Sequence, residues 1–168
     1  HEDEELAMFN RIREQCLAHG YQQYEISNFA RLGFSSRHNA NYWKGGSYLG
    51  LGAGAHSFAN TPGWGRRWSN ERNPTLYIKR ALVDRQARSF EETLTRSQAR
   101  GEFLFLNLRQ LDGLAFSAFV DRFGVSLSTE FPHLNDLVTE GLLHTTDERV
   151  SLTPQGLLIA DTIFASFF

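Results

Sequence analysis

The chain has 168 residues, a formal net charge of −2 at pH 7, and 41% hydrophobic and 13% aromatic residues. This composition is typical of a globular protein with one medium domain or two small ones. No apolar run reaches the roughly 20 residues of a membrane-spanning helix, and HEDEELAMFN lacks the basic and apolar regions of a signal peptide. We therefore expect a cytoplasmic protein with no integral membrane segment.

The first segment, DEELAMFNRIREQCLAHG, predicts an amphipathic helix. Its apolar face carries Leu6, Phe9, Ile12 and Cys16, and Gly20 is a suitable C-terminal cap. Cys16 is the single cysteine, so this chain alone forms neither an intrachain disulfide nor a cysteine-ligated cluster. Because the apolar face needs a covering surface, we expect the chain to be a piece cut from a longer protein.

The next segments are short or rich in glycine. YEISNFA alternates apolar and polar residues and predicts a short strand. HNANYW, followed by two glycines, predicts a loop, and SYLGLGAGAHSFA predicts a strand whose glycines let another backbone or a ligand approach closely. TPGWGRRWSNERNP predicts a turn-rich connection.

The remaining segments predict helices and one hairpin. Pro74 opens a helix over TLYIKRALVDRQ, and EETLTRSQARGEFLFLNLRQL predicts a longer helix that contains Gly101. After a composition break at Asp112-Gly113, AFSAFVDRFG and LSTEFPHLNDLVTEG predict two helices, LLHTT and RVSLT a β-hairpin, and QGLLIADTIFASFF a closing helix capped by Thr153-Pro154. This order of elements is typical of a small winged-helix-like module.

The charge of the last third argues against nucleic-acid binding. Residues 110–168 carry 2 basic and 8 acidic side chains, and the would-be recognition helix at 127–140 has no Lys or Arg. Affinity for DNA depends on neutralising phosphates, so an acidic module is repelled by it. We expect this module to be a structural cap or a protein-docking domain.

Two common site patterns fail because of their context. GLGAGA formally satisfies G-x-G-x-x-A, but the following HSFANTPGWG cannot begin the helix that a dinucleotide site needs. His38 and His56 have no carboxylate or cysteine at metal-ligand spacing around them. We therefore expect neither a dinucleotide site nor a structural zinc site.

The HNANYW segment combines residue types that haem sites use. His38 is an imidazole ligand, Tyr42 and Trp43 have flat apolar faces, and a cationic residue flanks the segment on each side, as a propionate partner would. In the alternative interpretation, buried aromatic residues anchor the loop, and His38 and Asn39 hydrogen-bond the backbone. The residue types alone favour this structural alternative.

The stretch GYQQYEISNFARLGFSSRHNANYWKGGSYLGLGAGAHSF closely resembles the C-terminal half of the radical S-adenosylmethionine proteins related to oxygen-independent coproporphyrinogen III oxidase. Its H-N-x-x-Y-W element, here His38, Asn39, Tyr42 and Trp43, is similar to that of the haem-chaperone branch and is not expected in the oxidases proper. EFLFLNLRQLDGL and LTPQGLLIADTIFASFF extend the resemblance over essentially all of the chain.

The resemblance implies a mixed fold, α+β or α/β. Residues 1–73 would supply the last strands and helices of a partial (β/α) TIM-like barrel, residues 74–111 linker helices, and residues 112–168 the winged-helix-like module. In such proteins a C-x-x-x-C-x-x-C motif holds a [4Fe–4S] cluster to which S-adenosylmethionine binds. That motif is absent here, so we expect no cluster metal in this chain and no activity from the fragment alone.

The resemblance also implies site residues. It places the S-adenosylmethionine cofactor near Gly50, Leu51 and Gly52, and it assigns the haem ligand to His38, with Asn39, Tyr42 and Trp43 beside it. Together with the chemistry of the segment, it favours haem binding by His38 over a purely structural role.

Two functional hypotheses follow. In the first, the parent protein is a haem chaperone that binds haem and delivers it to an unidentified acceptor protein. In the alternative, it is an oxygen-independent coproporphyrinogen III oxidase, an oxidoreductase of porphyrin biosynthesis, and the HNANYW segment only shapes the substrate mouth. Because an isolated barrel segment exposes strand edges, we also expect self-association of the fragment.

Overall fold

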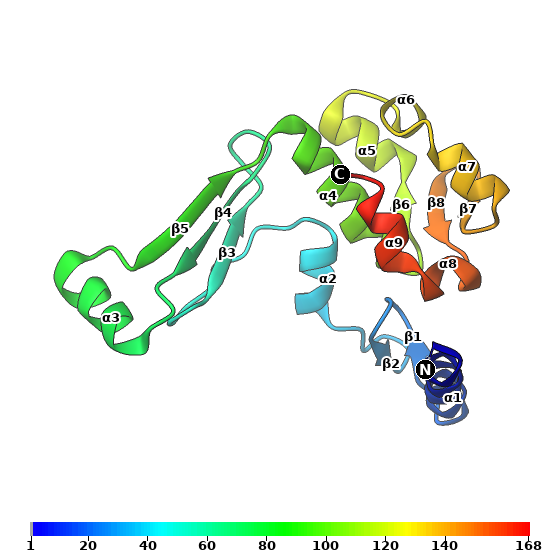
Figure 1. Cartoon of the computed structure of the whole chain (residues 1–168), viewed down its shortest axis with the longest axis horizontal. Helices are drawn as coiled ribbons and strands as arrows, with labels where there is room; N and C mark the ends of the chain where they lie inside the picture. Colours follow the sequence, from blue (N-terminus) through cyan, green and yellow to red (C-terminus); the bar gives the residue numbers. More distant parts are fainter. Residues whose placement is uncertain (1) are drawn as a thin grey trace.

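The computed structural model describes residues 2–168. Figure 1 shows the N-terminal part as helix α1 (Glu2–Ala18), the two short antiparallel strands β1 (Gln22–Gln23) and β2 (Phe29–Ala30), and helix α2 (Arg37–Trp43). α1 ends as predicted, because Gly20 takes a positive φ of 79° just after the helix.

The predicted strand at 24–30 forms only at its end. Its last two residues pair as β2 with β1, whereas Glu25 makes a single bridge to Gln110. A second prediction for this region is wrong: HNANYW is not a loop but helix α2. Gly45 and Gly46, the glycines that favoured a loop, lie after the helix and end it.

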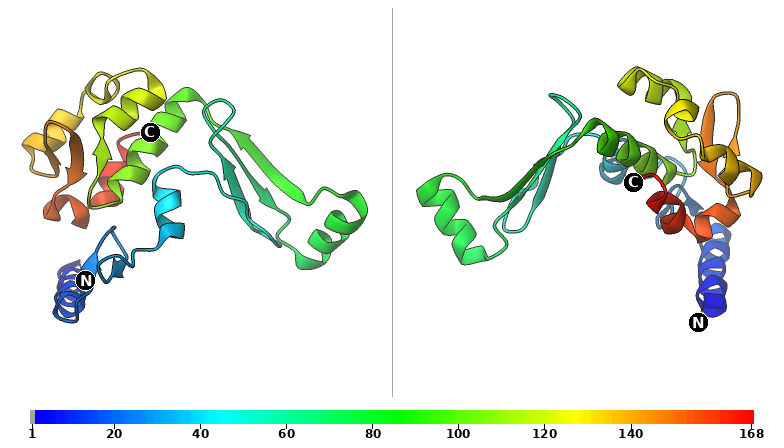
Figure 2. Two further views of the ribbon diagram at one scale, coloured as in Figure 1. Left: turned by 180° about the vertical axis from the view of Figure 1, so that it is seen from behind. Right: turned by 45° about the horizontal axis from the view of Figure 1, so that its top comes forward.

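The apolar side chains of α1 lack a cover among the described residues. Leu6 is 37% exposed and Ile12 54% exposed. Both views in Figure 2 show α1, in dark blue beside the N-terminus, at the edge of the molecule. The helix predicted from the sequence is therefore confirmed, while a further surface that covers its apolar face stays a prediction.

A three-stranded antiparallel sheet forms an extended arm, residues 56–93. Its strands are β3 (His56–Ala59), β4 (Arg66–Asn70) and β5 (Arg88–Thr93), in the spatial order β3-β4-β5. Helix α3 (Pro74–Lys79) and a π-helical turn, η1 (Arg80–Asp84), connect β4 to β5. Figures 1 and 2 show this arm standing away from the C-terminal part of the chain, with α3 at its far end.

Three predictions for the arm and the segment before it are wrong. Residues 66–70 were expected in a turn-rich connection but form the central strand, because they pair on both sides. Residues 91–93 were expected to begin a helix but belong to β5. Residues 49–55 were expected in a strand but are irregular, and only the bridge between Tyr48 and Phe58 continues the sheet there.

Helix α4 (Arg96–Leu108) connects the arm to the C-terminal module. Thr95 caps it through a reciprocal capping box with Gln98, which explains why the helix begins after β5 rather than within it. Gly101 lies inside this helix, as predicted. A Cβ at that position would lie 2.7 Å from the carbonyl oxygen of Phe167, so glycine allows the C-terminal residues to pass close to α4.

The C-terminal module contains the predicted hairpin, the predicted first helix and one further strand, and the predicted closing helix is interrupted at Ile159. The predicted second helix is divided in two around Pro132, which has no backbone N–H. Thr153 caps α8 as predicted, because its side chain accepts from the N–H of Gly156. The sheet order is β6-β8-β7. The elements are β6 (Leu114–Ala115), α5 (Phe116–Phe123), α6 (Leu127–Glu130), α7 (Leu134–Thr139), β7 (Leu143–Thr145), β8 (Arg149–Leu152), α8 (Pro154–Leu158) and α9 (Ala160–Ala165).

The hydrophobic core lies between α4 and the C-terminal module. Leu104 and Leu108 of α4 are completely buried, and Phe119 and Phe123 of α5 pack in the same cluster. The arm reaches this core through Trp64, whose ring stacks on Phe123 with centroids 5.8 Å apart. Within residues 2–168, no helix has the length and apolarity needed to cross a bilayer.

Candidate functional site

Helix α2 positions the H-N-x-x-Y-W residues. Ser36 caps the helix, because its side chain accepts a hydrogen bond from the N–H of Asn39 at 3.2 Å. Gly45, with a positive φ of 67°, ends it by donating its N–H to the carbonyl of Tyr42. His38 and Tyr42, four residues apart in the helix, therefore lie on the same face.

The side chains of His38 and Tyr42 are in direct contact. The Tyr42 hydroxyl lies 3.0 Å from His38 Nε2, and the two rings meet edge to face with centroids 4.8 Å apart. Tyr48 packs against the other side of Tyr42, with ring centroids 4.4 Å apart. The histidine is exposed, whereas both tyrosines are half-buried. The structure thus brings His38 and Tyr42 together as a hydrogen-bonded pair.

Trp43 and Asn39 of the same element have other surroundings. Trp43 is half-buried beneath the guanidinium of Arg109, and its Nε1 is buried without a hydrogen-bond partner among the described residues. Asn39 is half-buried and contributes its backbone N–H to the cap of α2. Trp43 therefore links α2 to the end of α4, while Asn39 helps to start the helix.

An open cavity of about 420 Å³ lies between α2, the first two strands of the arm and α4. This volume is within the roughly 300–1,000 Å³ typical of small-molecule sites. A larger hollow of about 520 Å³ lies beside α1 and is lined by none of the predicted site residues. Rings line most of the cavity near α2: those of Tyr42, Trp43, Tyr48, Phe58, Phe105 and Phe168.

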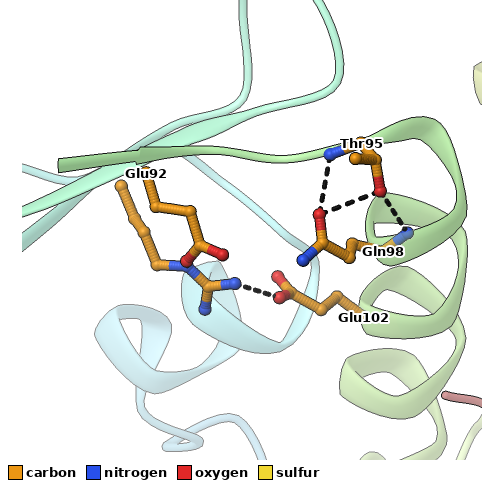
Figure 3. A network of polar contacts seen from close by, with 5 residues as sticks. Glu92, Thr95, Gln98 and Glu102 are labelled. Carbon is orange, nitrogen blue, oxygen red and sulfur yellow. Dashed lines mark hydrogen bonds and ion pairs between the residues drawn. The ribbon is translucent and has the colours of Figure 1, made fainter.

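An ion-pair network forms the polar side of this cavity. Arg67 of β4 pairs with Glu102 of α4 and, at 2.8 Å, with Glu92 of β5. Figure 3 shows Glu102 and the Thr95–Gln98 capping box projecting from the same end of α4, close to Glu92. The network therefore fixes the arm to the helix that carries the other wall of the cavity.

The environment shifts the pKa values of two groups on this cavity. Burial lowers the pKa of the Arg67 guanidinium, but the carboxylates of Glu102 and Glu92 more than offset this, and the net pKa is raised. Burial also raises the pKa of the Tyr48 hydroxyl, and Tyr42 and Glu102 raise it further against the opposite effect of Arg67. Tyr48 is therefore held neutral and Arg67 charged.

The three residues predicted to contact S-adenosylmethionine lie in the irregular segment before β3, away from the His38–Tyr42 pair. The N–H of Gly50 donates to Ser57 Oγ at 2.9 Å, and the carbonyls of Gly50 and Gly52 accept from the amide of Asn70. Leu51 is 82% exposed. The bare Cα of Gly50 faces the chain itself, because a Cβ there would lie 2.1 Å from the carbonyl oxygen of His56.

The described residues include no group of three or more His, Cys, Asp or Glu side chains that could hold a metal ion. Cys16 is half-buried on α1. The cluster motif requires three cysteines, and the sequence has one.

Comparisons with known proteins show what this chain is similar to. The HemN C-terminal domain model matches residues 94–159. Heme chaperone HemW of Bacillus subtilis is 36% identical over 99% of this chain, and Heme chaperone HemW of Lactococcus lactis is 30% identical over 99%. The chain matches the C-terminal part of HemW-type proteins. It spans 43% and 42% of the lengths of these two relatives, that is, less than half of either.

A solved structure shares the fold of this chain. The coproporphyrinogen III oxidase HemN of Escherichia coli, described as a radical SAM enzyme, superposes with a TM-score of 0.73 over 96% of this chain and 40% of its own. The sequence identity is 17%, so the likeness concerns the fold. The mixed α/β fold and the resemblance stated from the sequence are thereby confirmed.

Sequence reasoning missed the residues opposite α2. Arg67, Tyr48, Glu102 and Phe168 all line the cavity but come from separate elements. Nothing local in the sequence indicates that β4, which carries Arg67, faces α4. Only the pairing of β4 with β5, and the turn from β5 into α4, brings these side chains together.

Proposed function

We propose that this chain is the haem-binding C-terminal part of a haem chaperone, and that His38, Asn39, Tyr42 and Trp43 belong to its haem site. The observation that carries the proposal is the placement of the His38–Tyr42 pair beside an aromatic cavity. The printed names of the relatives, heme chaperones HemW, support the same function. The haem is cargo here, delivered to an acceptor protein that has yet to be found.

The residues present fit a haem by their chemistry. A flat macrocycle suits a cavity lined by rings, and aromatic faces stack well on such a surface. Arg37 and Lys44, at the two ends of α2, are exposed and available to carboxylates such as the haem propionates. His38 and Tyr42 are each side chains of a type that binds haem iron.

The finer architecture and the cofactor site are part of this proposal. Residues 1–73 would complete a radical SAM barrel in the parent protein, residues 74–111 would link it, and residues 112–168 would form a winged-helix-like module. The sheet order β6-β8-β7 with helices before and after the hairpin supports the last assignment. Exposed Leu51 and the neighbouring Gly50 and Gly52 are the candidate contacts to S-adenosylmethionine, whose [4Fe–4S] cluster would be held by another part of the parent protein.

A haem titration tests the function. Ferric haem is added to this chain, to the double variant His38→Ala/Tyr42→Phe and to the matched control His144→Ala, an exposed histidine of β7. The Soret band should shift saturably in the parent chain and the control, and not in the double variant. Binding that is absent from the parent chain, or unchanged in the double variant, would disprove the proposal.

The oxidase alternative makes a different prediction for the full-length parent protein. If the parent were a coproporphyrinogen III oxidase, reconstituted protein with its cluster and S-adenosylmethionine would decarboxylate coproporphyrinogen III. A haem chaperone would instead transfer bound haem to an apoprotein without decarboxylation. Since the oxidase likeness is one of fold at 17% identity, the chaperone function is the better supported.

A further inference from the structure

The structure separates the positions of the two candidate iron ligands. The ring of Tyr42 forms part of the cavity wall, whereas His38 is exposed and is not among the described residues that line the cavity. The resemblance assigns the iron to His38. The placement of the side chains instead gives Tyr42 the position next to a bound macrocycle.

The hydrogen bond between the two side chains leads to the same assignment. When the Tyr42 hydroxyl donates to His38 Nε2, Nδ1 carries the ring proton, and neither nitrogen has a lone pair left for a metal. In the opposite tautomer, Nε2–H donates to the Tyr42 oxygen, which is the contact that stabilises a phenolate. In that tautomer Nδ1 keeps a lone pair, so both ring nitrogens are withheld from a metal only when the Tyr42 hydroxyl is the donor. The same arrangement leaves Nε2 able to take up the Tyr42 proton.

We propose that Tyr42 is the ligand of ferric haem iron and that His38 positions it and takes up its proton. In the binding step the Tyr42 O–H bond breaks, the proton passes to His38 Nε2, and an oxygen electron pair forms the bond to Fe(III). No electron is transferred, and no further reactant is needed. Tyrosine is a known axial ligand of haem iron. This inference rests on the proposed function, because it refines the same haem site.

The neighbours of Tyr42 favour this role. Tyr48 and Phe58 continue the aromatic wall behind it, with ring centroids 4.4 Å apart for Tyr42 and Tyr48 and 6.3 Å apart for Tyr48 and Phe58. The contact with Tyr48 restrains the Tyr42 ring, so its oxygen is held at a defined place. Tyr77→Phe is a matched control, since it removes a hydroxyl from a tyrosine of α3 that is not among the described residues lining the cavity.

The experiment compares ferric haem bound to this chain and to its Tyr42→Phe, His38→Ala and Tyr77→Phe variants. Absorption and electron paramagnetic resonance spectra distinguish a phenolate-ligated ferric haem from an imidazole-ligated one. Circular dichroism of each variant shows that it is folded before haem is added. A second titration after chemical reduction of the iron compares the affinities of the ferric and ferrous states.

The expected result is a phenolate spectrum in the parent chain and in Tyr77→Phe, and its loss in Tyr42→Phe. His38→Ala should keep the phenolate spectrum but bind haem roughly 10- to 100-fold more weakly, the usual effect of removing a residue that hydrogen-bonds a metal ligand. Reduction should weaken binding in the parent chain, because an anionic oxygen favours the ferric state.

An imidazole spectrum that persists in Tyr42→Phe and disappears in His38→Ala would overturn the inference and leave the proposed function intact. A parent chain that shows no saturable haem binding would overturn both. The two failures are thus distinguished by whether the unsubstituted chain binds haem at all.

Discussion

The guanidinium of Arg109 lies over the indole ring of Trp43, 4.6 Å from the ring centroid. The same guanidinium is 3.7 Å from the carboxylate of Glu25, which is completely buried. Glu25 Oε1 also accepts from the Ser27 N–H and the Asn28 amide. One arginine at the end of α4 therefore connects the segment between β1 and β2 with the helix that carries the candidate haem site.

Arg109→Ala should destabilise the chain by about 3 kcal/mol, because it leaves the buried Glu25 carboxylate without its cation. Glu25→Gln should cost less, since a neutral amide oxygen can still accept from Ser27 and Asn28. Urea denaturation followed by circular dichroism measures both changes in the free energy of unfolding. An Arg109→Ala variant as stable as the parent chain would contradict the proposed link.

The raised pKa of Tyr48 predicts a loss of stability at alkaline pH. Its pKa is raised above the ordinary value of 10.0, chiefly by burial, so the folded state favours the neutral hydroxyl. The stability that the neutral hydroxyl contributes is fully present below the pKa of Tyr48 in the unfolded chain, and it is lost as the pH rises above that value. The free energy of unfolding should therefore fall more steeply above that pH in the parent chain than in Tyr48→Phe. Parallel pH profiles for the two proteins would rule this out.

Gly50→Ala should be destabilising by about 2 kcal/mol, because an added methyl group overpacks a closed backbone contact. Its Cβ would lie 2.1 Å from the carbonyl oxygen of His56. Gly52→Ala is the matched control two residues later: its Cβ meets no atom within 4 Å, and its cost arises from a φ of 104° instead. Thermal unfolding of the two variants compares these effects. Equal stability of Gly50→Ala and the parent chain would show that the segment adapts.

Self-association of this chain should depend on the apolar residues at the far end of the arm. Leu82 is 76% and Val83 72% exposed in η1. Such side chains associate with other apolar surfaces when no cover is present. Sedimentation velocity should show concentration-dependent oligomers, and Leu82→Ser/Val83→Ser should shift them toward the monomer. The exposed Val120→Ser variant, in the C-terminal module, is the control that should leave the distribution unchanged.

Local signals in the sequence predicted most helices correctly. Gly20 after α1, Pro74 at α3 and Thr153-Pro154 before α8 each act through the backbone of their own turn, so they are effective without tertiary contacts. The signal for α2 was also local but was outweighed by the glycines around it. Ser36 followed by Asn39 is a helix start, and Gly45 is its end.

The arm could not be predicted from its own residues. Strands β4 and β5 are polar and short, and each becomes a strand because the other pairs with it across the intervening α3 and η1. Such pairing is decided by distant segments, and local propensity contributes little to it.

The candidate site also has one part that the sequence determines and another that depends on tertiary contacts. The sequence by itself determined the chemistry of the site, because the residue types of H-N-x-x-Y-W and their spacing in the chain require no partner. Only the tertiary structure decided that Tyr42 faces a cavity and that His38 lies at its hydroxyl. Which side chain faces the cavity depends on where the helix meets β4 and α4. The opposite wall of that cavity includes residues more than twenty positions away in the sequence, among them Arg67 and Phe168.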